Sequence, residues 1–207
     1  MTKLVPLSDP ARVRFTAVAI ALHWTIAALI LTNIGLAWRF LSLEGMKALP
    51  LIQVHKTIGM AVLTLTVLRL AWRLTNPPPA YPADMKRWEK AAAHVTHWGF
   101  YGFMLLTPLT GWMASSASTM GFPIHMIGDV NWPFVPFIHN RPMPERKLLM
   151  EPLSEAHRLM TYLGYALIFV HVGAALKHQF VARDTVLWRM LPLSALRRRP
   201  AAVQEPA

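Results

Sequence analysis

The sequence predicts an all-α membrane protein, a bundle of four transmembrane helices, and two observations carry this prediction. Hydrophobic residues make up 54% of the 207 residues, only 15% are charged, and the mean hydropathy is +0.34. A soluble domain usually carries about a quarter charged residues. Four apolar stretches also reach the roughly 20 residues that a helix needs to cross a bilayer. An ordinary soluble enzyme and a disordered chain are both excluded.

The first two stretches are residues 15–38 and residues 51–72. The first has no formal charge, and it is too long for a cleaved signal peptide and lacks a small-residue cleavage site, so we expect it to remain as a helix. The second is interrupted only by Lys56 near one end and Arg69 near the other.

The other two stretches are residues 91–116 and residues 159–176. The third again has no formal charge and contains Pro108, which we expect to kink the helix in a way that a packed membrane helix tolerates. The fourth lies between Arg158 and Lys177.

Lysine and arginine residues between the stretches predict the orientation. Fourteen lie on the side that holds both termini and the second connection, and seven lie on the other side. We therefore expect a multi-pass protein of the bacterial inner membrane with both termini in the cytoplasm. The net charge of +11 then reflects basic residues at the lipid surface, and no nucleic-acid partner is expected.

The chain is expected to hold one membrane domain, residues 15–192, after a cytoplasmic tail of residues 1–14. Residues 117–157 form the long outer connection, which we expect to be an ordered cap along the outer interface, with a simple tether as the alternative. Residues 193–207 are expected to be a disordered basic tail that could touch anionic lipids. A homodimer is left open, since no helix shows a clear GxxxG face.

Cysteine is absent, and nine histidines stand in a very apolar chain. The lack of cysteine excludes disulfides, thiolate zinc sites, iron–sulfur clusters and covalently attached c-type haem. Polar residues within a bilayer are costly and usually functional, so the positions of the histidines matter most.

Four histidines fall into two layers. His157 and His171 are fourteen residues apart, a rise of about 21 Å and nearly four turns, so they share one helix face. His55 is expected beside His157 near the outer surface, and His23 beside His171 near the inner one. Imidazoles on facing helices can hold iron from both sides. The pattern predicts two non-covalent b haems.

Small and charged residues accompany these histidines. Gly59 lies one turn after His55 and removes bulk beside it, while Gly35 and Gly164 could also let a macrocycle approach the backbone. Close helix packing explains each glycine equally well. The inner-layer Arg69 could pair with a haem propionate or snorkel to the headgroups, and Lys56 could pair with an outer propionate or attract an anionic reactant.

The remaining histidines leave alternatives open. By spacing alone, His94 or His97 could also be an inner ligand. His178 lies on the face of His171 at the cytoplasmic interface, where it could protonate a quinone or be a plain interfacial residue. His125 and His139 are expected on the outer surface. A histidine-lined metal or proton transporter is the competing class, although none of the four stretches contains Asp or Glu.

The sequence resembles the bacterial cytochrome b561 family of four-helix di-haem membrane proteins. The resemblance runs from about Arg14 to Pro192 and is weakest in the outer cap. The matching segments are ALHW, VHKTIGM, VLRLAWRL followed by NPPP, AHVTHWGFY, HRLMTYLGYALIFVHVGAALKH and DTVLWRMLP.

The resemblance implies axial ligands at His23, His55, His157 and His171, and none at His94 or His97. It also implies electron transfer between a ubiquinone pool and a second reactant, with His178 at the quinone site. Some members of the family resemble superoxide oxidases. If this chain does as well, Lys56 would help to attract the superoxide anion. The alternative is a membrane subunit that anchors a periplasmic redox enzyme, because the cap is longer here than in compact members.

Overall fold

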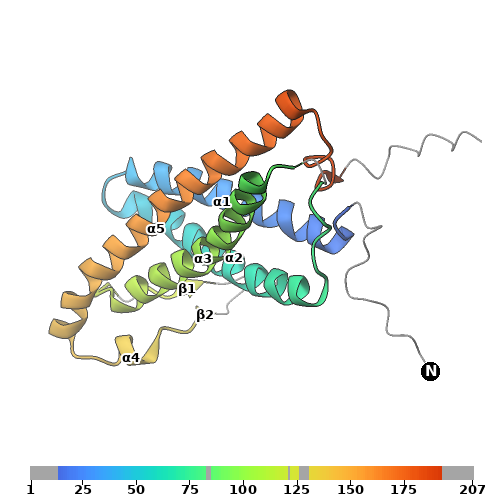
Figure 1. Cartoon of the computed structure of the whole chain (residues 1–207). Helices are drawn as coiled ribbons and strands as arrows, with labels where there is room; N and C mark the ends of the chain where they lie inside the picture. The colour runs from blue at the N-terminus through green and yellow to red at the C-terminus, as the bar shows by residue number, and fades with distance from the viewer. Residues whose placement is uncertain (1–13, 83–84, 121, 126–130, 193–207) are drawn as a thin grey trace, which may run out of the picture.

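The computed structural model describes residues 14–82, 85–120, 122–125 and 131–192. Four long helices dominate this part of the chain: α1 (Ala17–Leu41), α2 (Leu49–Thr75), α3 (Arg87–Ala117) and α5 (Met143–Lys177) (Figure 1). The expected C-terminal tail, residues 193–207, and all but the last residue of the expected N-terminal tail lie outside the described residues.

The helices pack in the order α1 on α2, α2 on α3, and α3 on α5. A small buried cluster of Ile26, Val62, Tyr101 and Met104 joins the first three helices. Many large apolar side chains point outward instead, and Phe169 on α5 is 81% exposed. Exposed apolar surface on this scale fits helices that face lipid rather than water.

Within the described residues, three helical segments are long and apolar enough to cross a membrane: Ala17–Leu41, Gly45–Thr75 and Met143–Ala182. The sequence predicted four such spans, and α3 is the one outside this set. Its 31 residues provide the length, but its charged first turn, its histidines and its Thr, Gly and Ser residues lower its hydropathy. Its place as the fourth span stays a prediction.

The fourth apolar stretch, residues 159–176, lies within a longer helix. α5 begins at Met143, inside the expected cap, and its 35 residues extend about 52 Å. The hydrocarbon core of a bilayer is about 30 Å thick, so α5 is long enough to project beyond it. The sequence reading stopped at Arg158 because the preceding turns carry charges, yet Pro144 sits in the first turn, where proline fits a helix start.

The described part of the outer connection is ordered. After α3, strand β1 (Ile124–His125) pairs antiparallel with β2 (Asn131–Trp132), and helix α4 (Pro136–His139) follows. Ala117, Val135 and Ile138 form a buried cluster under this cap. The buried Arg146 of α5 donates to the carbonyl oxygen of Ser118 at the end of α3. These contacts favour the ordered cap over the tether.

At the opposite end of the bundle, the chain folds back after α5. A short π-helical turn, η2 (His178–Ala182), leads into a segment that returns to the start of α1. There Trp24 donates its Nε1–H to the carbonyl oxygen of Met190 at 2.8 Å, and Arg189 donates to that of Ala80 at 2.7 Å. The returning segment therefore ties α1 and the α2–α3 connection to the end of α5.

Candidate functional site

The outer layer contains one facing pair of imidazoles. His55 on α2 and His157 on α5 have ring centroids 6.2 Å apart. Nδ1 of His55 lies 3.2 Å from the carbonyl oxygen of Asn33, and Nδ1 of His157 lies 2.8 Å from that of Thr107. A carbonyl oxygen can only accept a hydrogen bond, so Nδ1 carries the hydrogen and donates it, which leaves the lone pair of Nε2 free. Both rings are thus held in the form that binds a metal through Nε2.

The inner layer contains a second pair with a third ring beside it. His23 on α1 and His171 on α5 have centroids 6.2 Å apart, and His97 on α3 lies 6.0 Å from His171. Phe100 packs its edge against His171 at 5.2 Å. His94 is exposed, and its ring lies beside Trp98 instead. Of the two α3 histidines, only His97 reaches the inner layer.

Both pairs have the spacing of two axial ligands on one iron. A metal–imidazole bond is about 2 Å long and the ring centroid lies about 1 Å behind its nitrogen, so two such rings have centroids about 6 Å apart. Within the described ranges, no group of three or more His, Asp or Glu side chains could hold a metal ion. Two facing imidazoles at each level fit a b-type haem, whose iron takes two protein ligands.

Two residues of α3 that the sequence analysis did not identify, Thr110 and Gly111, lie beside the ring of His157. A Cβ added to Gly111 would lie 3.0 Å from two atoms of the His157 ring, so the glycine makes room for the imidazole. The Thr110 hydroxyl lies 3.5 Å from Nδ1 of the same ring. The signal was present as TPLTG, a polar and small-residue run inside an apolar helix.

The three glycines that the sequence analysis singled out have different surroundings in the structure. A Cβ on Gly59 would touch only Asn33 Nδ2 at 3.9 Å, and one on Gly35 would meet nothing within 4 Å. A Cβ on Gly164 would lie 2.1 Å from the Phe103 ring. The space beside Gly164 is therefore taken by helix packing, which is one of the two explanations that the sequence left open.

Two of the expected charged residues lie close to the histidine pairs. Arg69 lines a cleft at the inner end together with Arg73, Trp72 and Tyr101. Lys56 is half-buried and follows His55 directly on α2. Positive charge is thus available beside each layer for a carboxylate or another anion.

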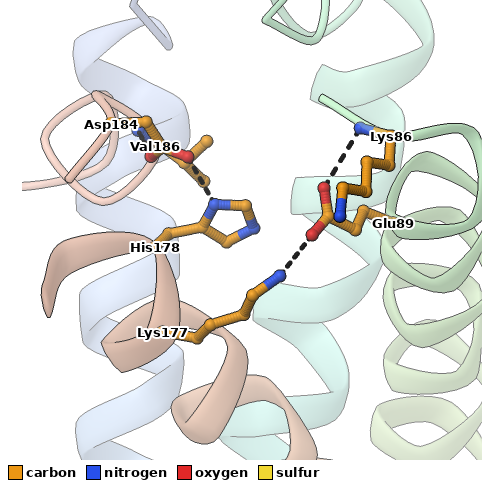
Figure 2. Close-up of polar contacts among 6 residues, drawn as sticks. All are labelled: Lys86, Glu89, Lys177, His178, Asp184 and Val186. Atoms are coloured by element: carbon orange, nitrogen blue, oxygen red, sulfur yellow. Dashed lines mark hydrogen bonds and ion pairs between the residues drawn. The ribbon is translucent and has the colours of Figure 1, made fainter. Parts of the chain in front are cut away.

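His178 is buried at the inner end and has an acidic partner that the sequence reading missed (Figure 2). Its Nδ1 lies 2.5 Å from Oδ2 of Asp184, and Oδ1 of Asp184 accepts from the backbone N–H of Val186 at 2.9 Å. Next to it, Lys177 forms an ion pair with Glu89 of α3. This hydrogen bond from Lys177 lowers the pKa of Glu89.

Outside these two layers and the inner end, the histidines belong to the cap. His125 is exposed, and its carbonyl oxygen accepts from Thr57 of α2. His139 is half-buried and stacks on Phe134 with centroids 4.1 Å apart.

The model of a known family matches residues 14–193 of the chain, and its description is prokaryotic cytochrome b561. The chain belongs to the prokaryotic cytochrome b561 family. The cytochrome is 25% identical to the probable superoxide oxidase CybB of Yersinia pestis over 183 residues, which cover 86% of this chain and 96% of the relative. It is 26% and 29% identical to cytochrome b561 homologs 2 and 1 of Escherichia coli (strain K12), over 88% and 86% of this chain and 93% and 97% of those relatives.

The family identifies the chain as a bacterial membrane b-type cytochrome that transfers electrons. Haem, when bound, supplies the one-electron redox chemistry that no side chain of this sequence provides. The protein contributes the ligands, the burial and the charges around the group.

Proposed function

We propose that this cytochrome holds two b haems, one between His55 and His157 and one between His23 and His171. The observation that carries the proposal is the pair of 6.2 Å ring separations at two levels of α5. Arg69 would pair with a propionate of the inner haem, and Gly59 would leave room beside the outer one. Both termini would lie in the cytoplasm, with the protein in the inner membrane.

In this proposal, the ubiquinone pool is the reactant at the inner end of the cytochrome. Quinone reduction takes up protons as well as electrons, so a titratable group is needed near the inner haem. His178 lies two turns beyond His171, at the start of η2, and its side chain is buried there. It is therefore our candidate for the residue that meets the quinone.

The outer reactant is superoxide in our first proposal. Lys56 stands beside His55, and positive charge there would steer a small anion toward the outer haem. The name of the Yersinia pestis relative points the same way. The runner-up is a membrane subunit that anchors a periplasmic redox enzyme. The length of α5 and the packed cap favour this second proposal, because they provide an ordered platform above the outer pair.

The two proposals are separated by one assay on the purified, haem-loaded protein. Superoxide from xanthine oxidase is supplied together with a short-chain ubiquinone, and reduction of the quinone is recorded with no other protein present. Quinone reduction that stops on addition of superoxide dismutase supports the first proposal. Failure of the assay, with a periplasmic redox protein co-purifying in mild detergent, supports the second. Lys56→Gln should lower the superoxide-dependent rate and weaken its dependence on salt.

A histidine-lined transporter remains the alternative from another class. The family match favours the cytochrome over it. A reduced-minus-oxidised visible spectrum decides between them, because two low-spin b haems per chain are expected for the cytochrome. A colourless protein from cells well supplied with haem would contradict the proposal.

A further inference from the structure

The end of α5 places one buried imidazole against one partly buried carboxylate. The two side chains are only 10% and 18% exposed, and Nδ1 of His178 lies 2.5 Å from Oδ2 of Asp184. Asp184 is held in turn by the backbone N–H of Val186. The Nε2 nitrogen of His178 points away from Asp184, to the side on which Glu89 and Lys177 lie (Figure 2).

The backbone is shaped to make this contact. α5 passes into a π-helical turn at His178, and such turns are rare and often mark functional sites. Arg183 then adopts a left-handed conformation with φ of 52°, which is uncommon for a residue other than glycine. Together these two irregularities reverse the chain, so that Asp184 returns beside a histidine six residues earlier.

The remaining charges around His178 are already paired. Glu89 of α3 acts on the imidazole electrostatically, but its carboxylate accepts hydrogen bonds from Lys177 and from the backbone N–H of Lys86 (Figure 2). Asp184 is therefore the carboxylate in direct contact with the ring among the described residues. A carboxylate on Nδ1 fixes the tautomer of an imidazole and stabilises its protonated form.

We propose that Asp184 is a positioning residue that keeps His178 able to donate a proton from Nε2 to the quinone. This inference rests on the proposed function. As a quinone carbonyl oxygen accepts an electron from the reduced cytochrome, the Nε2–H bond of His178 breaks and an O–H bond forms on that oxygen. The neutral imidazole regains a proton from water at the inner surface. Two such electron and proton transfers yield the hydroquinone.

The test compares two electron acceptors in haem-loaded protein reduced with stoichiometric dithionite. A short-chain ubiquinone needs protons, whereas ferricyanide accepts an electron without one. Reoxidation is followed in the visible spectrum between about pH 5 and pH 8, the range in which histidine changes its charge. Asp184→Asn should slow reoxidation by the quinone roughly tenfold at neutral pH, a part of the about 10²-fold that a positioned general acid contributes.

Three further results are expected from the same experiment. Asp184→Asn should change the pH profile of the quinone rate, while its ferricyanide rate and haem spectrum stay the same. Asp184→Asn should have no further effect on quinone reduction in a His178→Gln protein, because it acts through that ring. Glu155→Gln, which removes a carboxylate from the exposed pair with Arg158, should leave both rates unchanged.

The outcomes separate this inference from the proposed function. If the unaltered cytochrome reduces no quinone, the proposed function fails. If it does, and Asp184→Asn reduces quinone at the same rate with the same pH profile, the positioning role is wrong. Should that variant not fold, the unaltered protein still provides a test. A solvent deuterium isotope effect with the quinone but not with ferricyanide supports proton donation, and equal effects with both acceptors contradict it.

Discussion

Nδ1 of His157 lies 2.8 Å from the carbonyl oxygen of Thr107, so a ring carried by α5 takes its orientation from α3. One turn further along α3, Gly111 leaves the space that the ring occupies. α3, which supplies neither member of the outer pair, therefore controls how one of them points. Orientation of a ligand by the groups around it affects a metal site nearly as much as the ligand itself.

Gly111→Ala should disturb the outer haem selectively. The added methyl group would lie 3.0 Å from the His157 ring, and the hydrogen bond to Thr107 limits how far the ring can move away. Overpacking of this kind costs about 1–3 kcal/mol, which corresponds to roughly tenfold weaker retention of the outer haem. Haem per chain and the low-spin spectrum, measured during detergent dilution, check this result.

Gly102→Ala is the matched control on the same helix, because nothing lies within 4 Å of its added Cβ. Alanine is favoured over glycine in a helix by up to about 1 kcal/mol, so this variant should be as stable as the original or slightly more so. Equal loss of haem in both variants would mean that Gly111 has no special relationship with His157.

Gly164→Ala should destabilise the packing of α3 on α5. Its methyl group would lie 2.1 Å from the Phe103 ring, and either the ring or the helix must shift. We expect a loss of about 1–3 kcal/mol, seen as a fall of several degrees in the thermal unfolding midpoint in detergent. Phe103→Leu should restore part of the loss. Gly173→Ala, whose Cβ meets nothing within 4 Å, should leave the midpoint unchanged.

Much of the architecture was predictable because apolar length and histidine spacing are local properties of the sequence. Fourteen residues between His157 and His171 fix two levels on one helix face, and the structure brings a ring from another helix to each level. The start of α5 was not predictable in this way. The charged residues in its first turns have low hydropathy, which is typical of a loop, although they lie on a helix that extends beyond the expected span.

The partners of the histidines depend on contacts between distant segments, so the sequence could not assign them. Thr107 lies 50 residues before His157, and only the packing of α3 on α5 joins them. Asp184 is close to His178 in sequence, but its contact requires a π-turn and a left-handed Arg183 that no propensity predicts. Gly164 shows the same limit, because a glycine in an apolar helix does not reveal which neighbour fills its space.

The ion pair of Glu89 and Lys177 predicts a pH dependence of stability. The hydrogen bond from Lys177 lowers the pKa of Glu89 in the folded protein. A carboxyl group with a lowered pKa contributes stability that is fully present above its unfolded value, about 4.3, and is lost as the pH falls through the folded value. Thermal midpoints of the original and of Glu89→Gln should therefore differ at neutral pH and converge in acid.

The control for this comparison is Glu155→Gln, which removes an exposed ion pair between neighbouring turns of α5. Exposed pairs of this kind contribute little, so its midpoint should follow that of the original protein at every pH. A difference for Glu89→Gln that persists unchanged below pH 4 would show that its effect is not due to the charge of Glu89.

Replacement of single histidines should remove the haems one at a time. His171→Ala takes away the ring that faces His23, so we expect a pyridine haemochrome assay to fall from about two haems per chain to about one, with the outer haem retained. His157→Ala should give the same count with the inner haem retained, and the two variants should keep haems of different reduction potential. His97→Ala should keep both, although its ring lies 6.0 Å from His171. Loss of the inner haem in His97→Ala, with retention in His23→Ala, would make His97 the inner ligand in place of His23.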